Sequence, residues 1–106
     1  MPASARSGYV YVWRYVVPAA NRAAFERVYG ATGAWVELLG RAGGYRATQL
    51  LAEAEHEGRY MTIDEWDSRE AFELFRAEHA EAFDALDARC AELTSQEEPL
   101  GHFRVV

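Results

Sequence analysis

Two kinds of hydrophobic spacing alternate along the chain. Residues 9–17 read Tyr-Val-Tyr-Val-Trp-Arg-Tyr-Val-Val, a β-branched and aromatic run of period two that predicts a strand. Over 19–29, apolar residues recur at spacings of three and four, which is typical of a helix. A second helical piece follows, with Thr32 as its expected N-cap and Gly43-Gly44 as its end. The first part of the chain therefore predicts a strand and two short helices.

The middle of the chain predicts a hairpin. Strands are expected at 45–54 and 59–66, on either side of the polar turn Glu55-His56-Glu57-Gly58. A helix should begin directly afterwards, because Asp67 and Ser68 are both good N-caps and Glu70 completes a capping box.

The helix after the hairpin has the strongest periodicity in the sequence. One apolar stripe predicts a single continuous helix, and its members are Phe72, Phe75, His79, Phe83, Leu86, Cys90 and Leu93. Residues 94–99 form a polar break, and residues 100–106 predict a last strand.

The resulting order, β-α-β-β-α-β, predicts an α+β, ferredoxin-like split sheet with both helical layers on one face. We expect the first and third strands to be the central, parallel neighbours. Residues 1–8 are expected to be a flexible segment, and 9–106 a single domain. Apolar residues lie on both faces of the strands, so a homodimer that stacks sheet on sheet is predicted.

Charge and composition exclude several classes of protein. The 106 residues suffice for one domain, and 17 acidic against 11 basic residues give a net charge of −6, which argues against nucleic-acid binding. All 11 basic residues are arginine. No apolar run approaches the roughly 18 residues of a membrane span. The N-terminus lacks the apolar core of a secretory signal and Cys90 is the single cysteine, so a cytoplasmic location is expected.

The two central strands share a face pattern. The 14 aromatic residues are many for so small a core, and the six that lie on these two strands share one parity. That parity carries Tyr9, Tyr11, Trp13, Tyr15, Tyr60, Thr62, Asp64 and Trp66, whereas the opposite one carries Val10, Val12, Arg14, Val16, Met61, Ile63 and Glu65. An aromatic face with a few polar groups is typical of a small-molecule pocket, although a dimer interface would use the same residues.

Two residues of these elements are candidates for proton transfer. A carboxylate among aromatic rings should have a raised pKa, so Asp64 could act as a base, unless Arg14 or Arg104 pairs with it. His79 lies on the apolar stripe and should face the sheet, where it is either a second base or a core histidine satisfied by a neighbour. His56 should be solvated in its turn, and His102 belongs to the last strand.

The sequence contains no motif for metal binding, phosphate binding or a serine nucleophile. No His or Cys pair has metal-ligand spacing, the glycines form no phosphate loop, and no serine occupies a nucleophile elbow. We therefore expect neither a metal nor a cofactor.

The junction between the third strand and the following helix resembles a known family. Residues 60–72, Tyr-Met-Thr-Ile-Asp-Glu-Trp-Asp-Ser-Arg-Glu-Ala-Phe, have a strand ending in Trp, one polar residue, a Ser cap and then Ala-Phe, as in the antibiotic biosynthesis monooxygenases. The dimeric α/β barrel order of that family agrees over roughly residues 9–105. Residues 28–30, Trp35, Gly44-Tyr45 and 93–97 also resemble a bacterial branch of it.

The resemblance implies a pocket between sheet and helices and an oxidoreductase that works without a cofactor. A base deprotonates an electron-rich phenol or quinol, whose anion then passes an electron to oxygen. Asp64 or His79 would be the base and Arg14 or Tyr60 the hydrogen-bond donor. The residues expected to contact a small aromatic substrate are Tyr11, Trp13, Trp35, Tyr60, Thr62 and Trp66.

Two alternatives remain open. The absence of a strong catalytic motif is compatible with a non-catalytic dimeric module that binds a small ligand or has a structural role. Haem degradation ranks lower, because the haem-degrading members carry an Asn on the first strand and residues 9–17 contain none.

Overall fold

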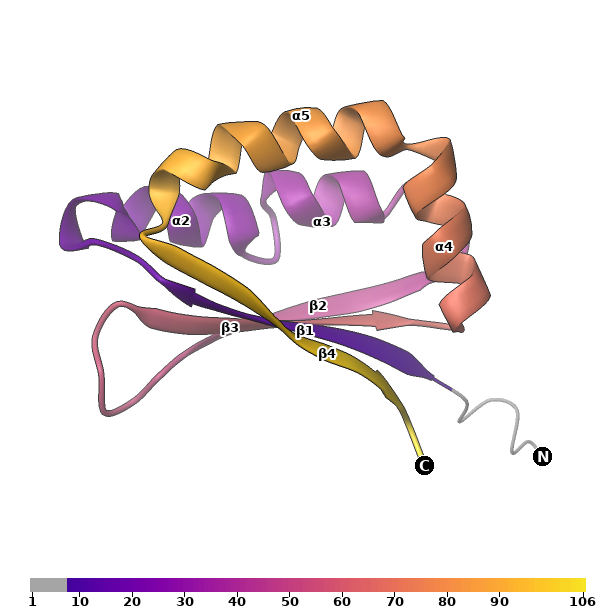
Figure 1. Ribbon diagram of the computed structural model, residues 1–106, viewed down its shortest axis with the longest axis horizontal. Helices are drawn as coiled ribbons and strands as arrows, with labels where there is room; N and C mark the ends of the chain where they lie inside the picture. The colour runs from indigo at the N-terminus through magenta and orange to yellow at the C-terminus, as the bar shows by residue number, and fades with distance from the viewer. Residues whose placement is uncertain (1–7) are drawn as a thin grey trace.

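The computed structural model describes residues 8–106 as two layers, a four-stranded sheet with helices across one face (Figure 1). The elements in chain order are β1 (Tyr9–Val16), η1 (Ala19–Asn21), α2 (Arg22–Tyr29), α3 (Ala34–Leu39), β2 (Tyr45–Ala52), β3 (Arg59–Trp66), α4 (Arg69–Glu78), α5 (Ala80–Cys90), η2 (Ala91–Leu93) and β4 (Gln96–Arg104). The predicted ferredoxin-like architecture is confirmed. Apart from Gly8, the expected flexible segment lies outside the described residues.

The sheet order is β2-β3-β1-β4, with β1 and β3 in the centre as predicted. These two strands run antiparallel, with Tyr9 opposite Trp66 and Tyr15 opposite Tyr60, so the expected parallel pairing was wrong. The reason is the hairpin. The helical crossover returns the chain so that β2 runs in the direction of β1, and the turn at 55–58 then reverses it for β3.

The helix predicted as one continuous element, with its apolar stripe from Phe72 to Leu93, is two helices followed by the short η2. The chain turns at His79, which has the non-helical angles φ −118° and ψ 27°, and α4 and α5 point in different directions (Figure 1). Backbone bonds continue through the turn, since His79 N–H donates to Phe75 and Phe83 N–H donates to His79, both over 2.9 Å. The apolar stripe still faces the sheet on both sides of the turn, where Phe75, Leu86 and Cys90 are buried. The spacing of apolar residues is the same in both helices, so it could not reveal the change of axis.

Local chemistry explains where two of the helices begin. Ser68 is the N-cap of α4, because its Oγ accepts the backbone N–H of Ala71 over 3.1 Å, whereas Asp67 pairs with Arg46. The N-cap of α3 is Gly33 and not the predicted Thr32. A Cβ at Gly33 would stand 2.2 Å from the Val28 carbonyl oxygen, so only glycine fits this close approach.

The last strand begins four residues earlier than predicted and contains a bulge. Val12 of β1 faces Gly101 while Trp13 faces Pro99, so Leu100 is the extra residue, and Gly101 adopts a φ of +141°. The bulge reverses the alternation along β4. As a result, odd-numbered residues before it and even-numbered residues after it face the helices.

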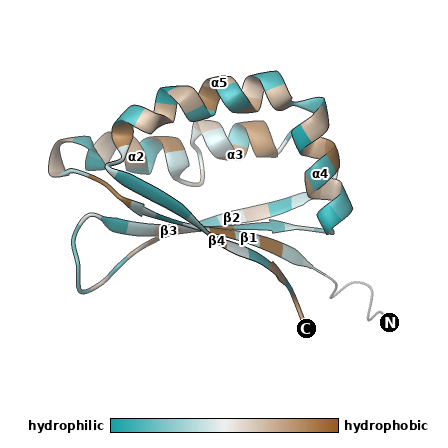
Figure 2. Cartoon of the chain, in the orientation of Figure 1, coloured by the Kyte–Doolittle hydropathy of each residue, from teal (hydrophilic) through white to brown (hydrophobic). Residues whose placement is uncertain are grey.

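The other sheet face carries no helix within residues 8–106 (Figures 1 and 2), and it combines apolar residues with the charged Arg14, Glu65 and Glu98. By the strand register, this face joins Leu51, the valines of β1, Met61, Ile63 and Phe103. Leu51 and Phe103 are 40% and 49% exposed. No helix among the described residues is long and apolar enough to cross a membrane.

Candidate functional site

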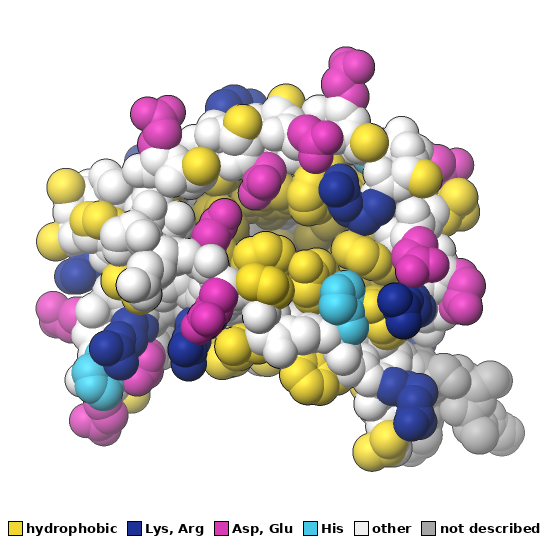
Figure 3. Space-filling view, viewed as in Figure 1, with side chains coloured by type: hydrophobic (Ala, Val, Ile, Leu, Met, Phe, Trp, Pro, Cys, Tyr) yellow, Lys and Arg dark blue, Asp and Glu magenta, His cyan; other side chains and the backbone are white. Residues whose placement is uncertain are grey.

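A cavity lies between the sheet and the helices. It holds about 580 Å³ of space unfilled by protein atoms, counting its open mouth. The mouth is visible as a hollow with hydrophobic walls, below the helical layer and above the sheet (Figure 3). The cavity thus lies between the sheet and the helices, the region in which the resemblance implied a pocket.

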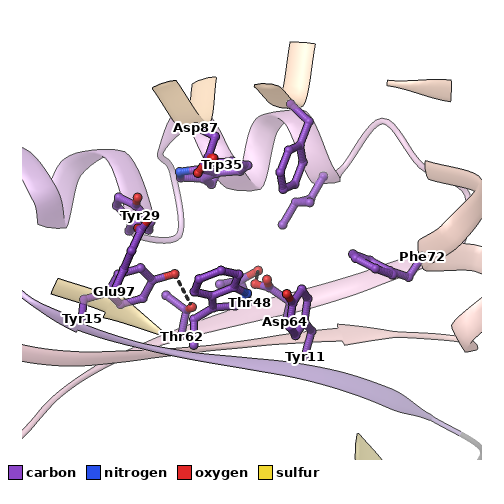
Figure 4. A pocket seen from close by; sticks show the side chains of 13 residues that line it. Tyr11, Tyr15, Tyr29, Trp35, Thr48, Thr62, Asp64, Phe72, Asp87 and Glu97 are labelled. Carbon is purple, nitrogen blue, oxygen red and sulfur yellow. Dashed lines mark hydrogen bonds between the residues drawn. The ribbon is translucent and has the colours of Figure 1, made fainter. Parts of the chain in front are cut away.

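Aromatic rings from both layers form the walls (Figure 4). The sheet contributes the alternate residues of β1, and the helical layer contributes rings from four segments; together they are Tyr11, Trp13, Tyr15, Tyr29, Trp35, Phe72 and Phe83. Several of these rings pack on one another, with Trp35 and Phe83 centroids 5.0 Å apart in an edge arrangement. Such walls suit a flat aromatic ligand, whose faces and edges find matching partners.

Asp64 is the lining carboxylate that projects from a central strand. Its Oδ1 accepts a hydrogen bond of 2.7 Å from Thr48, whose Oγ1 in turn accepts one of 2.8 Å from the Tyr45 hydroxyl. Burial raises the pKa of Asp64 to about 6, and the Thr48 hydrogen bond opposes the rise. Among the described residues no arginine pairs with it, so neither Arg14 nor Arg104 is its partner.

A second polar pair closes the floor of the cavity. The Tyr15 hydroxyl and the Thr62 Oγ1 are 3.0 Å apart, and Thr62 is only 3% exposed. Burial raises the pKa of Tyr15, so the phenol stays protonated at neutral pH and keeps a proton to donate. Asp64 and Tyr15 thus place an acceptor and a donor on the same aromatic surface.

Two further carboxylates lie on the rim of the cavity, and sequence reasoning missed both. Asp87 comes from α5 and Glu97 from β4, and both are exposed lining residues. Burial and the nearby Asp87 raise the pKa of Glu97. For Glu97 the sequence did contain a signal. Gly101 follows Leu100 within the last strand, and a glycine within a strand indicates a bulge, which changes the face to which the preceding residues point.

The structure does not bring the other two predicted catalytic residues to the cavity. His79 marks the turn between α4 and α5, where its ring stacks on Phe75 with centroids 5.2 Å apart. Arg14 projects from the opposite sheet face and pairs with Glu98 over 2.6 Å. Neither side chain lines the cavity, because one lies at a helix junction and the other has the outward parity of β1.

Two of the predicted binding residues are core residues. The Tyr60 hydroxyl donates to Glu26 over 2.6 Å beneath α2. Trp66 is fully buried against Phe72 and Phe75, and neither Tyr60 nor Trp66 lines the cavity. They share the parity of Asp64 but lie at the two ends of β3, where helices cover the sheet completely. The remaining predicted residues, Tyr11, Trp13, Trp35, Thr62 and Asp64, all line the cavity.

A histidine lies beside this aromatic surface. His102 of the edge strand β4 stacks on Tyr11 with ring centroids 3.9 Å apart, and its Nδ1 is hydrogen-bonded to the Tyr9 hydroxyl. Burial and the nearby Arg69 lower its pKa, so its ring is neutral at neutral pH. Within residues 8–106, no cluster of three or more His, Cys, Asp or Glu side chains could hold a metal ion.

Comparison with known proteins places this geometry in context. No protein-family model matches the sequence, and no curated protein matches it either. Solved structures do match. One is SnoaB of Streptomyces nogalater, a cofactor-independent oxygenase, with a TM-score of 0.68, 23% identity, and coverage of 92% of this chain and 91% of that one.

A second matching structure, from Bordetella bronchiseptica, is provisionally described as an antibiotic biosynthesis monooxygenase. Its TM-score is 0.71 at 17% identity, over 94% of this chain and 98% of that one. The chain has the fold of the antibiotic biosynthesis monooxygenases. A conserved protein of Methanosarcina mazei matches this chain as well, with a TM-score of 0.73, 12% identity and 97% coverage of both chains. At these identities the likeness establishes the fold, which is the one expected from residues 60–72.

Proposed function

We propose that the protein is a cofactor-independent monooxygenase that acts on a small quinol-type aromatic substrate in this cavity. The observation that carries the proposal is Asp64, a carboxyl with a pKa of about 6 among aromatic rings and without a cationic partner among the described residues. A carboxyl with a pKa near the working pH is suited to general-base catalysis. The fold shared with SnoaB agrees with this chemistry.

The proposed reaction balances with oxygen as the only co-substrate. Asp64 takes the hydroxyl proton of the quinol, and the resulting anion passes one electron to oxygen. The two radicals join at a ring carbon that carries hydrogen, and return of the proton gives a hydroperoxide. Loss of water breaks the O–O and C–H bonds, so that a quinol and one oxygen molecule yield a hydroxyquinone and water.

The chain's own residues would bind and orient the substrate for this reaction. Rings such as Trp13 and Phe83 would hold the aromatic plane and exclude water. The protonated Tyr15 hydroxyl would donate a hydrogen bond to the developing oxyanion, while Thr62 fixes its direction. Charge would then be stabilised in a dry site, where hydrogen bonds are stronger than in water.

Oxygen uptake with menadiol, a reduced naphthoquinone with one free ring position, tests the proposal. We expect uptake above autoxidation, together with a product that gains one oxygen atom from labelled oxygen. Menadiol binding without uptake would instead support the alternative, a non-catalytic ligand-binding module. Uptake that yields only hydrogen peroxide and menadione would contradict a monooxygenase.

The rate should depend on pH through Asp64. Because the carboxylate is the active form and its pKa is about 6, kcat/KM should rise with pH and level off above about pH 7. Thr48→Val removes a hydrogen bond that stabilises the charged form, so the midpoint should move to higher pH by roughly one unit. Thr48→Ser keeps the hydroxyl and is the matched control. An unchanged midpoint in Thr48→Val would contradict the assignment of Asp64 as the base.

The protein should form a homodimer through the bare sheet face. Covering its valines, Met61, Ile63 and Phe103 would remove apolar surface from water. Light scattering at micromolar concentration should give twice the mass of the 12.0 kDa chain. Ile63→Asp at the middle of the face should yield monomers, whereas Glu73→Gln on the exposed side of α4 should not. A monomeric mass for the unmodified chain would rule the dimer out.

A further inference from the structure

The rim acids Asp87 and Glu97 have a feature that the proposed reaction does not use. They come from different elements, α5 and β4, yet both line the same cavity, and the charge of Asp87 contributes to the raised pKa of Glu97. Neither forms an ion pair with any of the described arginines. Two neighbouring carboxylates without a cation repel each other, and a positive group between them would relieve the repulsion.

The walls next to these acids are aromatic. Trp35, Tyr15 and Tyr29 line the cavity together with Asp87 and Glu97, and Figure 4 shows these side chains away from the end of the cavity where Phe72 lies. The negative faces of such rings attract cations, and the attraction is stronger where water is excluded. The rings and the two carboxylates therefore favour the same sign of charge in this part of the cavity.

The interior of the cavity also favours a positively charged ligand. Asp64 on the floor accepts its hydrogen bond from Thr48 through Oδ1, and no Lys, Arg or His is among the described residues that line the cavity. Arg76 lies at the helical wall. It packs against Phe83, with its guanidinium carbon 3.9 Å from the ring centre, and pairs with Asp84 over 3.7 Å.

We propose that the cavity is selective for aromatic ligands that carry a cationic group, such as a protonated amine, which the rim carboxylates Asp87 and Glu97 hold while the aromatic body enters the cavity. Uncharged aromatic ligands bind more weakly, and carboxylated ones bind more weakly still. This selectivity rests on the proposed function and deepens it, because it defines which quinol-type molecules reach Asp64. It concerns binding, so it can be measured without turnover.

Three probes of nearly equal shape test the selectivity. Naphthylmethylammonium, naphthylmethanol and naphthoate differ in charge, and quenching of tryptophan fluorescence at about pH 7.5 reports their binding. We expect the cation to bind on the order of tenfold more tightly than the alcohol, as for charges several ångströms apart in a partly screened site. Naphthoate should bind more weakly than the alcohol by a similar factor.

The rim residues should account for the preference for the cation. Asp87→Asn combined with Glu97→Gln should bring the affinities for the cation and the alcohol to within about twofold of each other, chiefly by weakening the binding of the cation. Raising the salt concentration to about 0.5 M should reduce the preference in the unmodified protein, because the rim is exposed. Glu81→Gln, which changes an exposed glutamate in the first turn of α5, is the matched control and should keep the full preference.

Three results would overturn the inference. These are equal binding of the cation and the alcohol, naphthoate binding as tight as either, or failure of all three probes to bind. Menadiol-dependent oxygen uptake decides the proposed function separately. Selectivity without uptake would leave a cation-selective binding module, whereas uptake without selectivity would leave the monooxygenase and refute the role of the rim.

Discussion

Asp64→Asn should lower the rate of menadiol-dependent oxygen uptake by about two to four orders of magnitude, the range over which general bases contribute. Asparagine has nearly the same shape and its amide oxygen can accept the hydrogen bond from Thr48, so the cavity should stay intact. Only the ability to take a proton is lost. Stopped-flow and oxygen-electrode measurements at saturating menadiol should show the loss in kcat, with the binding of the uncharged naphthylmethanol retained.

The matched control is Asp67→Asn. Asp67 follows β3 directly, but its carboxylate pairs with Arg46 over 2.6 Å and does not line the cavity. This variant should keep its oxygen uptake within about twofold. An Asp64→Asn protein with undiminished uptake would remove Asp64 from the mechanism, and an equal loss in both variants would indicate a structural effect.

The same Asp64→Asn change should stabilise the protein at neutral pH. The pKa of Asp64 is raised from 3.8 to about 6 by folding, so the folded state holds this proton more tightly than the unfolded chain does. Stability from this group is therefore fully present below about pH 4 and is lost as the pH rises through 6. Since one pKa unit corresponds to about 1.4 kcal/mol, the ionised carboxylate costs up to about 3 kcal/mol above that pH.

Urea unfolding at two pH values measures this effect. Relative to the unmodified protein, Asp64→Asn should gain about 1–3 kcal/mol in free energy of unfolding near pH 7.5 and almost nothing near pH 4. If the substitution lowers activity and raises stability, the carboxylate serves the chemistry of the site and not the stability of the fold. Lower stability at neutral pH would show instead that the carboxylate is a structural group.

Trp66→Ala should cause a larger loss of stability than any of the cavity or rim substitutions, about 3–5 kcal/mol. Trp66 is fully buried and its ring packs on Tyr45, Phe72 and Phe75, so removal of the indole leaves a void in the core. Small domains have a total stability of only about 5–15 kcal/mol, so this variant should melt far below the unmodified protein or remain unfolded. Thermal and urea unfolding followed by circular dichroism give the measurement.

Two further variants keep the test informative if Trp66→Ala does not fold. Trp66→Phe keeps a ring and removes an indole nitrogen that is buried without a hydrogen-bond partner, so its loss should be much smaller. Trp13→Ala opens a wall that already faces the cavity, and should weaken probe binding more than stability. The opposite ranking of Trp66 and Trp13 would mean that Trp66 belongs to the binding surface.

The sequence by itself determined the order of elements and the two faces of the sheet. The alternation in β1 and β3 is local, because successive side chains of a strand must point to opposite sides. Asp64, Thr62, Tyr11 and Trp13 therefore could be assigned to the cavity side before any fold was known, and the structure places all four there. The N-cap Ser68 could be predicted in the same way, because a capping side chain interacts only with the first turn of its own helix.

Only the tertiary structure decided how far each residue of that face lies from the helices. Trp66 and Asp64 are two positions apart with the same parity, yet one is core and the other lines the cavity, because helical cover differs along β3. Two further features of the tertiary structure changed which residues reach the cavity. The turn between α4 and α5 keeps His79 away from it, and the bulge at Gly101 brings Glu97 to it. Periodicity describes directions within a single element, whereas a site depends on distances between elements, which are set by packing.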